Sequence, residues 1–185
     1  MSGAPPATHV ALLRGVNVGG RQRVAMDRLR EVVSGLGHTG VRTYAQSGNL
    51  LLCCGRAGAS AADVATEIDQ AIAADMGVTT RVVVRTPEEL AAVVAANPFT
   101  EAAAAAPTSV HVAFFSAPPA PGAPGLGAVS FVPDGWSLGD RVAYLHYAAG
   151  AGRSKLTNDV LERRLGVVST ARNWNTVTRL LALAI

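Results

Sequence analysis

The residues that could do chemistry gather at three segments where a predicted strand passes into a predicted helix. The first segment runs from Arg14 through Asn17, Gly19 and Gly20 to Arg23. Backbone N–H groups at such a turn, next to guanidinium groups, commonly bind a phosphate or carboxylate. The glycine spacing is not G-x-G-x-x-G and the following strands look antiparallel, which argues against a Rossmann fingerprint. The alternative is a turn that needs glycine for positive φ.

The second segment is GAGRSK, residues 150–155, where Ser154 is expected to cap a helix that starts there. Lys155 beside it is the one lysine of the chain. The residue order of a Walker A loop is absent, and no acid for magnesium follows on an apolar strand. The segment therefore fits either a phosphate contact or a well-capped helix.

The third segment is STARNWNTV, residues 169–177, where Thr170 is expected to cap the last helix. Free amides and Arg172 would then face one point beside Asn173. A helix dipole contributes only about 0.3–1 kcal/mol to anion binding, so Arg172 would supply most of the affinity. Alternatively, Asn173 and its polar neighbours only fix the helix, with Trp174 in the core.

The last candidate residues lie in a predicted polar hairpin at residues 46–49. Ordinary turn chemistry explains Ser47 and Asn49 but not Gln46, and Ser47 has no His and Asp of a catalytic triad at a recognisable spacing. No catalytic residue is therefore assigned. The predicted ligand-binding residues are Arg14, Asn17, Gly19, Gly20, Arg23, Gln46, Ser154, Lys155, Arg172 and Asn173.

The elements that position these residues follow from hydrophobic periodicity. Residues 8–86 have the order β-α-β-β-α-β of a ferredoxin-like unit. Its strands are expected at 9–14, 41–45, 50–54 and 81–85, with helices from Met26 to a stop at Gly37 and from Ser60 onward. The fold class is therefore α+β.

The second half predicts a further α+β subdomain that ends in two helices. Thr86 and Pro87 are expected to start a helix, and 117–127 reads as a surface loop. Strands are expected at 109–115, 129–132 and 142–147, with a turn at Pro133-Asp134-Gly135 between the last two and residues 136–138 as an alternative extension of the last strand. Helices are expected at 154–165 and from 172 to the end. Subdomains 1–86 and 87–185 are expected to pack as one compact unit.

Composition limits the class of protein. The chain has 185 residues, of which 49% are hydrophobic, enough for a sizeable core. No apolar run approaches the roughly 20 residues of a membrane span, and no secretory signal is evident. Cys53 and Cys54 are adjacent, which disfavours a disulfide and fits a cytoplasmic protein. The histidines lack ligand spacing, so no metal or cofactor is predicted.

Charge is distributed unevenly along the chain. Residues 1–45 hold six basic and two acidic residues, 46–140 three and nine, and 141–185 seven and two. Both ends are therefore basic, which suggests an anionic partner, although coding bias toward arginine would give the same pattern.

Four segments together resemble a known family: ALLRGVNVGG at 11–20, TYAQSGN at 43–49, NPF at 97–99 and STARNWNTV at 169–177. They are similar, in this order, to the hallmarks of a bacterial domain-of-unknown-function family. The resemblance implies a compact bacterial α+β fold, and it implies no established activity, substrate or cofactor. Relatives often carry an aromatic residue where this chain has Cys53 and Cys54.

The functional prediction is binding of a small phosphorylated or carboxylated ligand, with enzymatic activity left undecided. The first alternative is sequence-nonspecific binding of RNA or DNA. Its weakness is that the central strands HVALLR and LLLCC offer no aromatic side chain for base stacking. The second alternative is a structural or interaction protein whose polar motifs only fix turns and helix ends.

Overall fold

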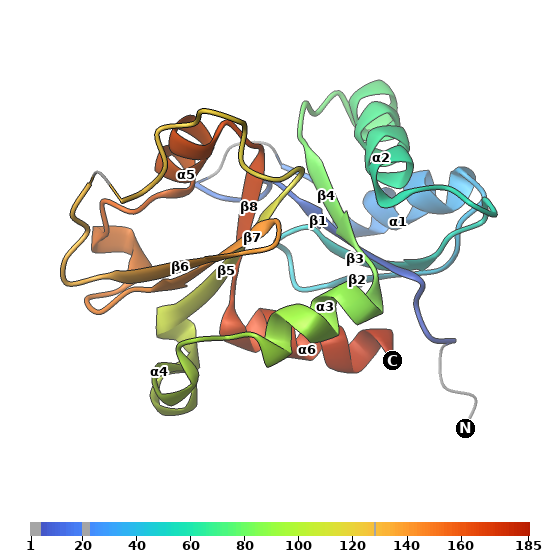
Figure 1. Ribbon diagram of the computed structural model, residues 1–185. Helices are drawn as coiled ribbons and strands as arrows, with labels where there is room; N and C mark the ends of the chain where they lie inside the picture. The colour runs from blue at the N-terminus through green and yellow to red at the C-terminus, as the bar shows by residue number, and fades with distance from the viewer. Residues whose placement is uncertain (1–4, 20–22, 128) are drawn as a thin grey trace. The chain divides into compact units, whose positions relative to one another are not determined.

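The computed structural model describes residues 5–19, 23–127 and 129–185, and it divides into two compact units (Figure 1). The first unit comprises Met1–Ala91 with Leu180–Ile185, and the second comprises Ala92–Arg179. Each unit carries one four-stranded antiparallel sheet and helices, so the predicted α+β class is confirmed.

The first unit is built on a ferredoxin-like βαββαβ arrangement. Its elements are β1 (His9–Leu13), α1 (Met26–Gly35), β2 (Thr39–Tyr44), β3 (Asn49–Cys53), α2 (Ala61–Met76), β4 (Val82–Arg85) and the first turns of α3 (Pro87–Ala95). The strand order is β2-β3-β1-β4, with every neighbouring pair antiparallel. This order is the one expected for a split βαβ unit, which agrees with the sequence pattern.

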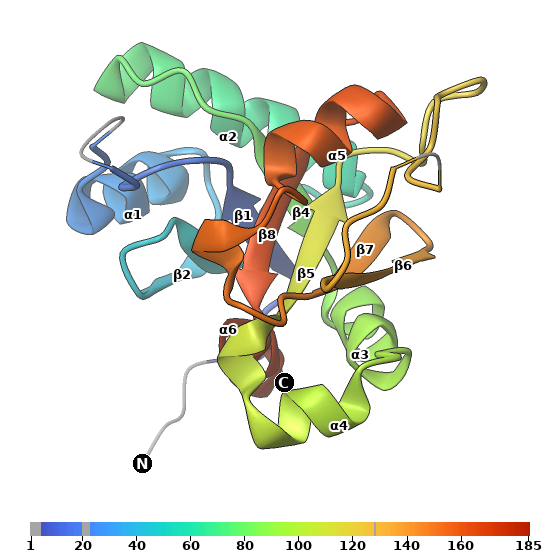
Figure 2. The ribbon, with the colours of Figure 1, turned by 90° about the vertical axis from the view of Figure 1, so that its left-hand side faces the viewer.

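The core of this unit lies between the sheet and helices α1 and α2, which lie side by side on one face (Figures 1 and 2). Alternate residues of the strands point to those helices, among them Ala11 and Leu13 of β1 and Leu50 and Leu52 of β3. The residues between them, including Val10, Leu12 and Leu51, are equally buried. Burial on both faces explains why the strands read as continuous apolar runs.

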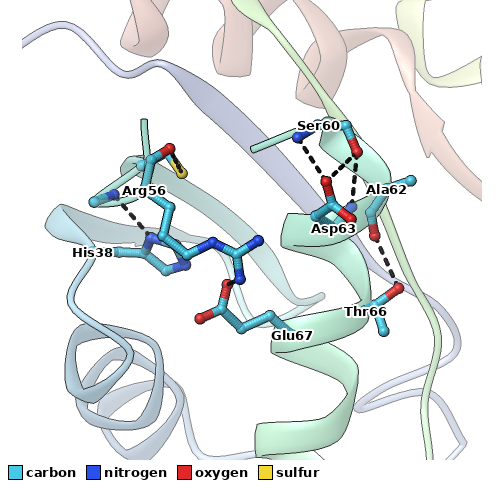
Figure 3. A network of polar contacts seen from close by, with 9 residues as sticks. His38, Arg56, Ser60, Ala62, Asp63, Thr66 and Glu67 are labelled. Atoms are coloured by element: carbon cyan, nitrogen blue, oxygen red, sulfur yellow. Dashed lines mark hydrogen bonds and ion pairs between the residues drawn. The ribbon is translucent and has the colours of Figure 1, made fainter. Parts of the chain in front are cut away.

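Helix α2 begins at a reciprocal capping box (Figure 3). Ser60 Oγ accepts a hydrogen bond from the Asp63 N–H at 3.1 Å, and the Asp63 carboxylate accepts one from the Ser60 N–H at 3.0 Å. The Asp63 carboxylate also accepts from the Ser60 hydroxyl at 2.7 Å, and this bond, followed by the one from the Ser60 N–H, lowers the pKa of Asp63 below its ordinary value. The helix start predicted at Ser60 is therefore confirmed.

The second unit also carries an antiparallel sheet, of order β6-β7-β5-β8. In chain order its elements are the end of α3, α4 (Thr100–Ala105), the 3₁₀ turn η1 (Pro107–Ser109), β5 (Val110–Phe115), β6 (Gly135–Gly139), β7 (Val142–His146), the 3₁₀ turn η2 (Ala151–Arg153), α5 (Asn158–Leu165), β8 (Ser169–Asn173) and α6 (Trp174–Ala184), whose end belongs to the first unit. Strands β5 and β8 run side by side, and α5 lies against β8 (Figure 2).

The strand predicted at 129–132 is wrong. That segment turns instead, with the Val129 N–H donating to the Leu126 carbonyl and the Asp134 N–H donating to the Phe131 carbonyl. Phe131 enters the core while Val132 stays 85% exposed. The pairing with β7 is made by β6, in register from Gly135 opposite His146 to Gly139 opposite Val142.

The start predicted for the last helix is also wrong. Residues 169–173 form β8, which pairs with β5, so Thr170 does not cap a helix. The reason is burial: Ser169 and Thr170 are almost fully buried and complete the sheet. Helix α6 begins at Trp174, and Asn173 Oδ1 accepts from the Thr176 N–H at 2.9 Å.

Replacing the capping serine should weaken the first unit measurably. We expect Ser60→Ala to lower the free energy of unfolding by about 1 kcal/mol, because the Asp63 N–H at the start of α2 loses its acceptor, Ser60 Oγ. The measurement is urea denaturation followed by circular dichroism. Ser34→Ala, at an exposed position inside α1, is the matched control and should change stability by less than about 0.5 kcal/mol. Equal effects of the two changes would contradict the capping role.

Candidate functional site

Asn17 is the centre of the loop that follows β1. Its Nδ2 donates to the carbonyl oxygens of Val24 and Gln46, at 2.9 and 2.7 Å. Its Oδ1 accepts from the Val24 N–H at 2.9 Å. The side chain thus joins the end of the loop to the β2–β3 hairpin, and it holds this position with a φ of +56°. Structural bonding accounts for both N–H groups of its amide.

The other predicted residues of this loop lie around that clamp. The backbone of Arg14 is held by the residues just before β4, since its N–H donates to the Arg81 carbonyl at 2.8 Å and its carbonyl accepts from the Thr80 hydroxyl at 2.9 Å. Gly19, Arg23 and Gln46 are exposed, and Gly20 lies outside the described residues. The structure therefore brings Asn17 and the Gln46 backbone together.

The hairpin between β2 and β3 packs against the end of β1 and the loop that follows it. Asn49 is fully buried, and its Nδ2 donates to the Tyr44 carbonyl and to Ser47 Oγ, at 2.9 and 3.0 Å. Gly48 has a φ of +69°, and a Cβ there would lie 2.6 Å from Val16 Cγ2 and 2.7 Å from Leu13 Cβ. Only glycine fits this position.

A second polar cluster surrounds the end of β3 (Figure 3). His38 is buried and its Nδ1 accepts from the Gly55 N–H at 3.2 Å. Arg56 forms an ion pair with Glu67 at 3.2 Å. These contacts join the segment after β3 to the turn between α1 and β2 and to α2, which is a structural role.

Residues of the predicted segment 150–155 line a cavity within the second unit. It has a volume of about 160 Å³. Its walls come from two stretches of chain, 130–134 and 149–155. They contribute Ser130, Phe131, Val132, Pro133, Asp134, Ala149, Gly150, Arg153, Ser154 and Lys155. We call it the Arg153–Lys155 pocket.

The core fixes both walls of this pocket. Phe131 in one wall and Leu156, which follows the other, belong to the same buried cluster. Asp134 Oδ1 accepts from the Ala148 N–H at 2.9 Å, and the Tyr147 hydroxyl donates to the Leu156 carbonyl at 3.0 Å. Burial, and secondarily the charge of Asp134, raises the pKa of Tyr147 to about 12, so this hydroxyl keeps its proton at neutral pH.

The cationic wall is a turn that begins at Gly150, whose φ is +87°. Ser154 does not cap a helix, because residues after it extend to bury Leu156, and α5 is capped instead by Thr157. Ser154 Oγ accepts from the Leu156 N–H at 2.9 Å, which leaves its hydroxyl proton available to a ligand. Arg153 and Lys155 are exposed, and neither forms an ion pair with any residue that the structure describes.

Arg172 and Asn173 do not line this pocket. Arg172 is buried, and its guanidinium donates to Thr170 Oγ1 and to the Ala171 carbonyl, each at 2.8 Å. Burial lowers its pKa to about 10, so it still carries its charge at neutral pH. Asn173 is occupied in starting α6.

Sequence reasoning missed the acidic wall of the pocket. Asp134 was interpreted only as a turn residue between two strands, and 130–132 as part of a strand. A signal was present, since Pro133-Asp134-Gly135 places a carboxylate at a turn rather than on a solvated helix face.

Two expectations concern thiols and metals. Cys53 and Cys54 are free, and their Sγ atoms donate to the carbonyls of Pro6 and Arg56, at 3.2 and 3.4 Å. Within residues 5–19, 23–127 and 129–185, no three His, Cys, Asp or Glu side chains gather as a metal would require. In the same residues no helix is both long and apolar enough to cross a membrane.

The sheet of the first unit does not offer the surface by which ferredoxin-like domains usually read RNA. Such domains stack bases on aromatic side chains of an open sheet face. Here the central strands β1 and β3 carry no aromatic residue, and the residues on both of their faces are buried. Strands β1 and β3 therefore carry no aromatic side chain on which a base could stack.

Comparisons with known proteins agree with this architecture. The family model described as "Protein of unknown function (DUF1697)" matches residues 7–144. A solved structure of the conserved bacterial protein SP0830 from Streptococcus pneumoniae has a similar fold, with a TM-score of 0.72 and 18% sequence identity. That match covers 98% of this chain and 100% of the other. No protein with a curated description matches the chain.

The effect of the close contacts at Gly48 on stability can be measured separately from the effect of its positive φ. We expect Gly48→Ala to destabilise the protein by about 1–3 kcal/mol more than Gly58→Ala, because both positions have positive φ but only Gly48 meets neighbouring side chains. Urea denaturation midpoints of the two variants give this difference. Equal losses would show that the hairpin does not need the tight contact with Leu13 and Val16.

Proposed function

The chain belongs to this family of unknown function, and we propose that it binds a small phosphorylated or carboxylated ligand in the Arg153–Lys155 pocket. The observation that carries the proposal is the pair of cations at one cavity, without an ion-pair partner among the described residues. Surface cations are commonly solvated, but a concave site concentrates their field on a bound anion.

The donors of the pocket suit an oxyanion. The Arg153 guanidinium offers a planar fork for two oxygen atoms, Lys155 offers a compact charge, and the Ser154 hydroxyl supplies a neutral donor. Hydrogen bonds of charged donors to phosphate or carboxylate are about twice as strong as neutral ones.

The size of the pocket limits the ligand to a small molecule. At about 160 Å³ it is well below the roughly 300–1,000 Å³ typical of sites for drug-sized ligands. Among the described residues, no hydrogen bond joins Ser154 Oγ to Lys155 or Asp134, the groups of the lining that could serve as a base. The arrangement therefore supports the binding of an anion.

Removing either cation should weaken anion binding. We expect Arg153→Gln and Lys155→Gln each to raise the Kd for 3-phosphoglycerate at least tenfold, because each loses a charge-assisted hydrogen bond of about 1.5–3 kcal/mol. Isothermal titration calorimetry on the full chain measures the change.

Arg163→Gln is the matched control, since Arg163 is an exposed residue of α5 outside the pocket and its loss changes the net charge equally. The Kd of this variant should stay within about twofold of wild type, given that exposed charges are screened. An equal weakening in all three variants would mean nonspecific attraction. Unchanged affinity in both pocket variants would end the proposal.

A further inference from the structure

The Arg153–Lys155 pocket is lined by a carboxylate as well as by two cationic side chains. Asp134 lines it from the opposite wall and is half-buried. Its Oδ1 is occupied by the Ala148 N–H, and no described residue donates to its Oδ2. One carboxylate oxygen is therefore fixed by the protein and the other remains for a ligand.

Asp134 does not neutralise the cations of the pocket. In the described part of the chain, no ion pair joins it to Arg153 or Lys155, although all three side chains line one small cavity. A site built for a simple anion gains nothing from a carboxylate, because like charges repel and weaken binding. Separated charges of both signs instead match a ligand that carries both signs itself.

We infer that the ligand is a small amino-bearing anion, whose ammonium group binds Asp134 and whose anionic groups bind Arg153 and Lys155. This inference rests on the proposed function of the pocket and specifies its ligand class. Two cations against one carboxylate favour a ligand with more negative than positive groups. An amino acid with a second acidic group has this pattern.

The remaining lining agrees with a small polar ligand that has a short apolar part. Val132 and Pro133 form the apolar portion of the acidic wall, and Val132 is 85% exposed. The cavity of about 160 Å³ has room for the charged groups of a small molecule.

The test compares two probes that differ only at the amino group. O-phosphoserine carries an ammonium group where 3-phosphoglycerate carries a hydroxyl, while the phosphate and the carboxylate are the same. Calorimetry on the full wild-type chain should give a Kd at least tenfold lower for O-phosphoserine, the factor expected of one charge-assisted hydrogen bond. Asp134→Asn keeps an oxygen for the Ala148 N–H and removes the charge, so it should bring the ratio of the two Kd values to within about twofold.

The outcomes separate this inference from the proposed function. Equal affinity of the wild-type chain for both probes would overturn the amino-group inference and leave anion binding intact. Failure of both probes to bind at millimolar concentrations would overturn both. A preference for O-phosphoserine that survives in Asp134→Asn would show that another group selects the amine. The ratio measured on the wild-type chain alone decides the ligand class even if Asp134→Asn does not fold.

Discussion

The structure depends on satisfying backbone groups where buried strands end. A buried N–H or carbonyl without a partner costs about as much as a lost hydrogen bond, and strands β1 and β3 end inside the protein. Asparagine side chains supply the missing partners, since an amide can donate and accept in the geometry of a backbone group. Asn17 does so for the loop after β1, and Asn49 does so for the hairpin before β3.

The second unit uses the same device. Asn97 accepts from the Phe99 N–H at 3.0 Å, and Asn158 donates to the Ser169 carbonyl at 2.7 Å. Asn173 accepts from the Thr176 N–H. Four of the motifs by which the chain resembles its family therefore contain an asparagine that stabilises the fold. The family motifs therefore stabilise the fold, and they lie outside the ligand pocket. Of the predicted ligand-binding residues, only Ser154 and Lys155 line that pocket.

The first half of the fold could be predicted because its signals are local. Apolar runs, the helical spacing after Met26 and the capping serine at Ser60 each act within a few residues, and they agree with one another. The errors lie where burial depends on distant partners. Thr170 resembles a helix cap in isolation, but pairing with β5 makes it a strand residue, and Ser154 loses its capping role because Leu156 must reach the core. Asp134 could not be assigned to the pocket, because its neighbours 149–155 come from the far side of the β6–β7 hairpin.

Charged groups distinguish the Arg153–Lys155 pocket from the family motifs. In the motifs, asparagine side chains bond to the backbone, whereas Arg153, Lys155 and one oxygen of Asp134 have no partner among the described residues. Their separation is set by apolar anchors, since Phe131 and Leu156 bury one residue of each wall in the same cluster. A ligand then meets a backbone whose position is already fixed at both walls, so less of its binding free energy is lost in ordering the chain. Affinity should for this reason depend on the packing of Phe131 and Leu156 as well as on the charges themselves.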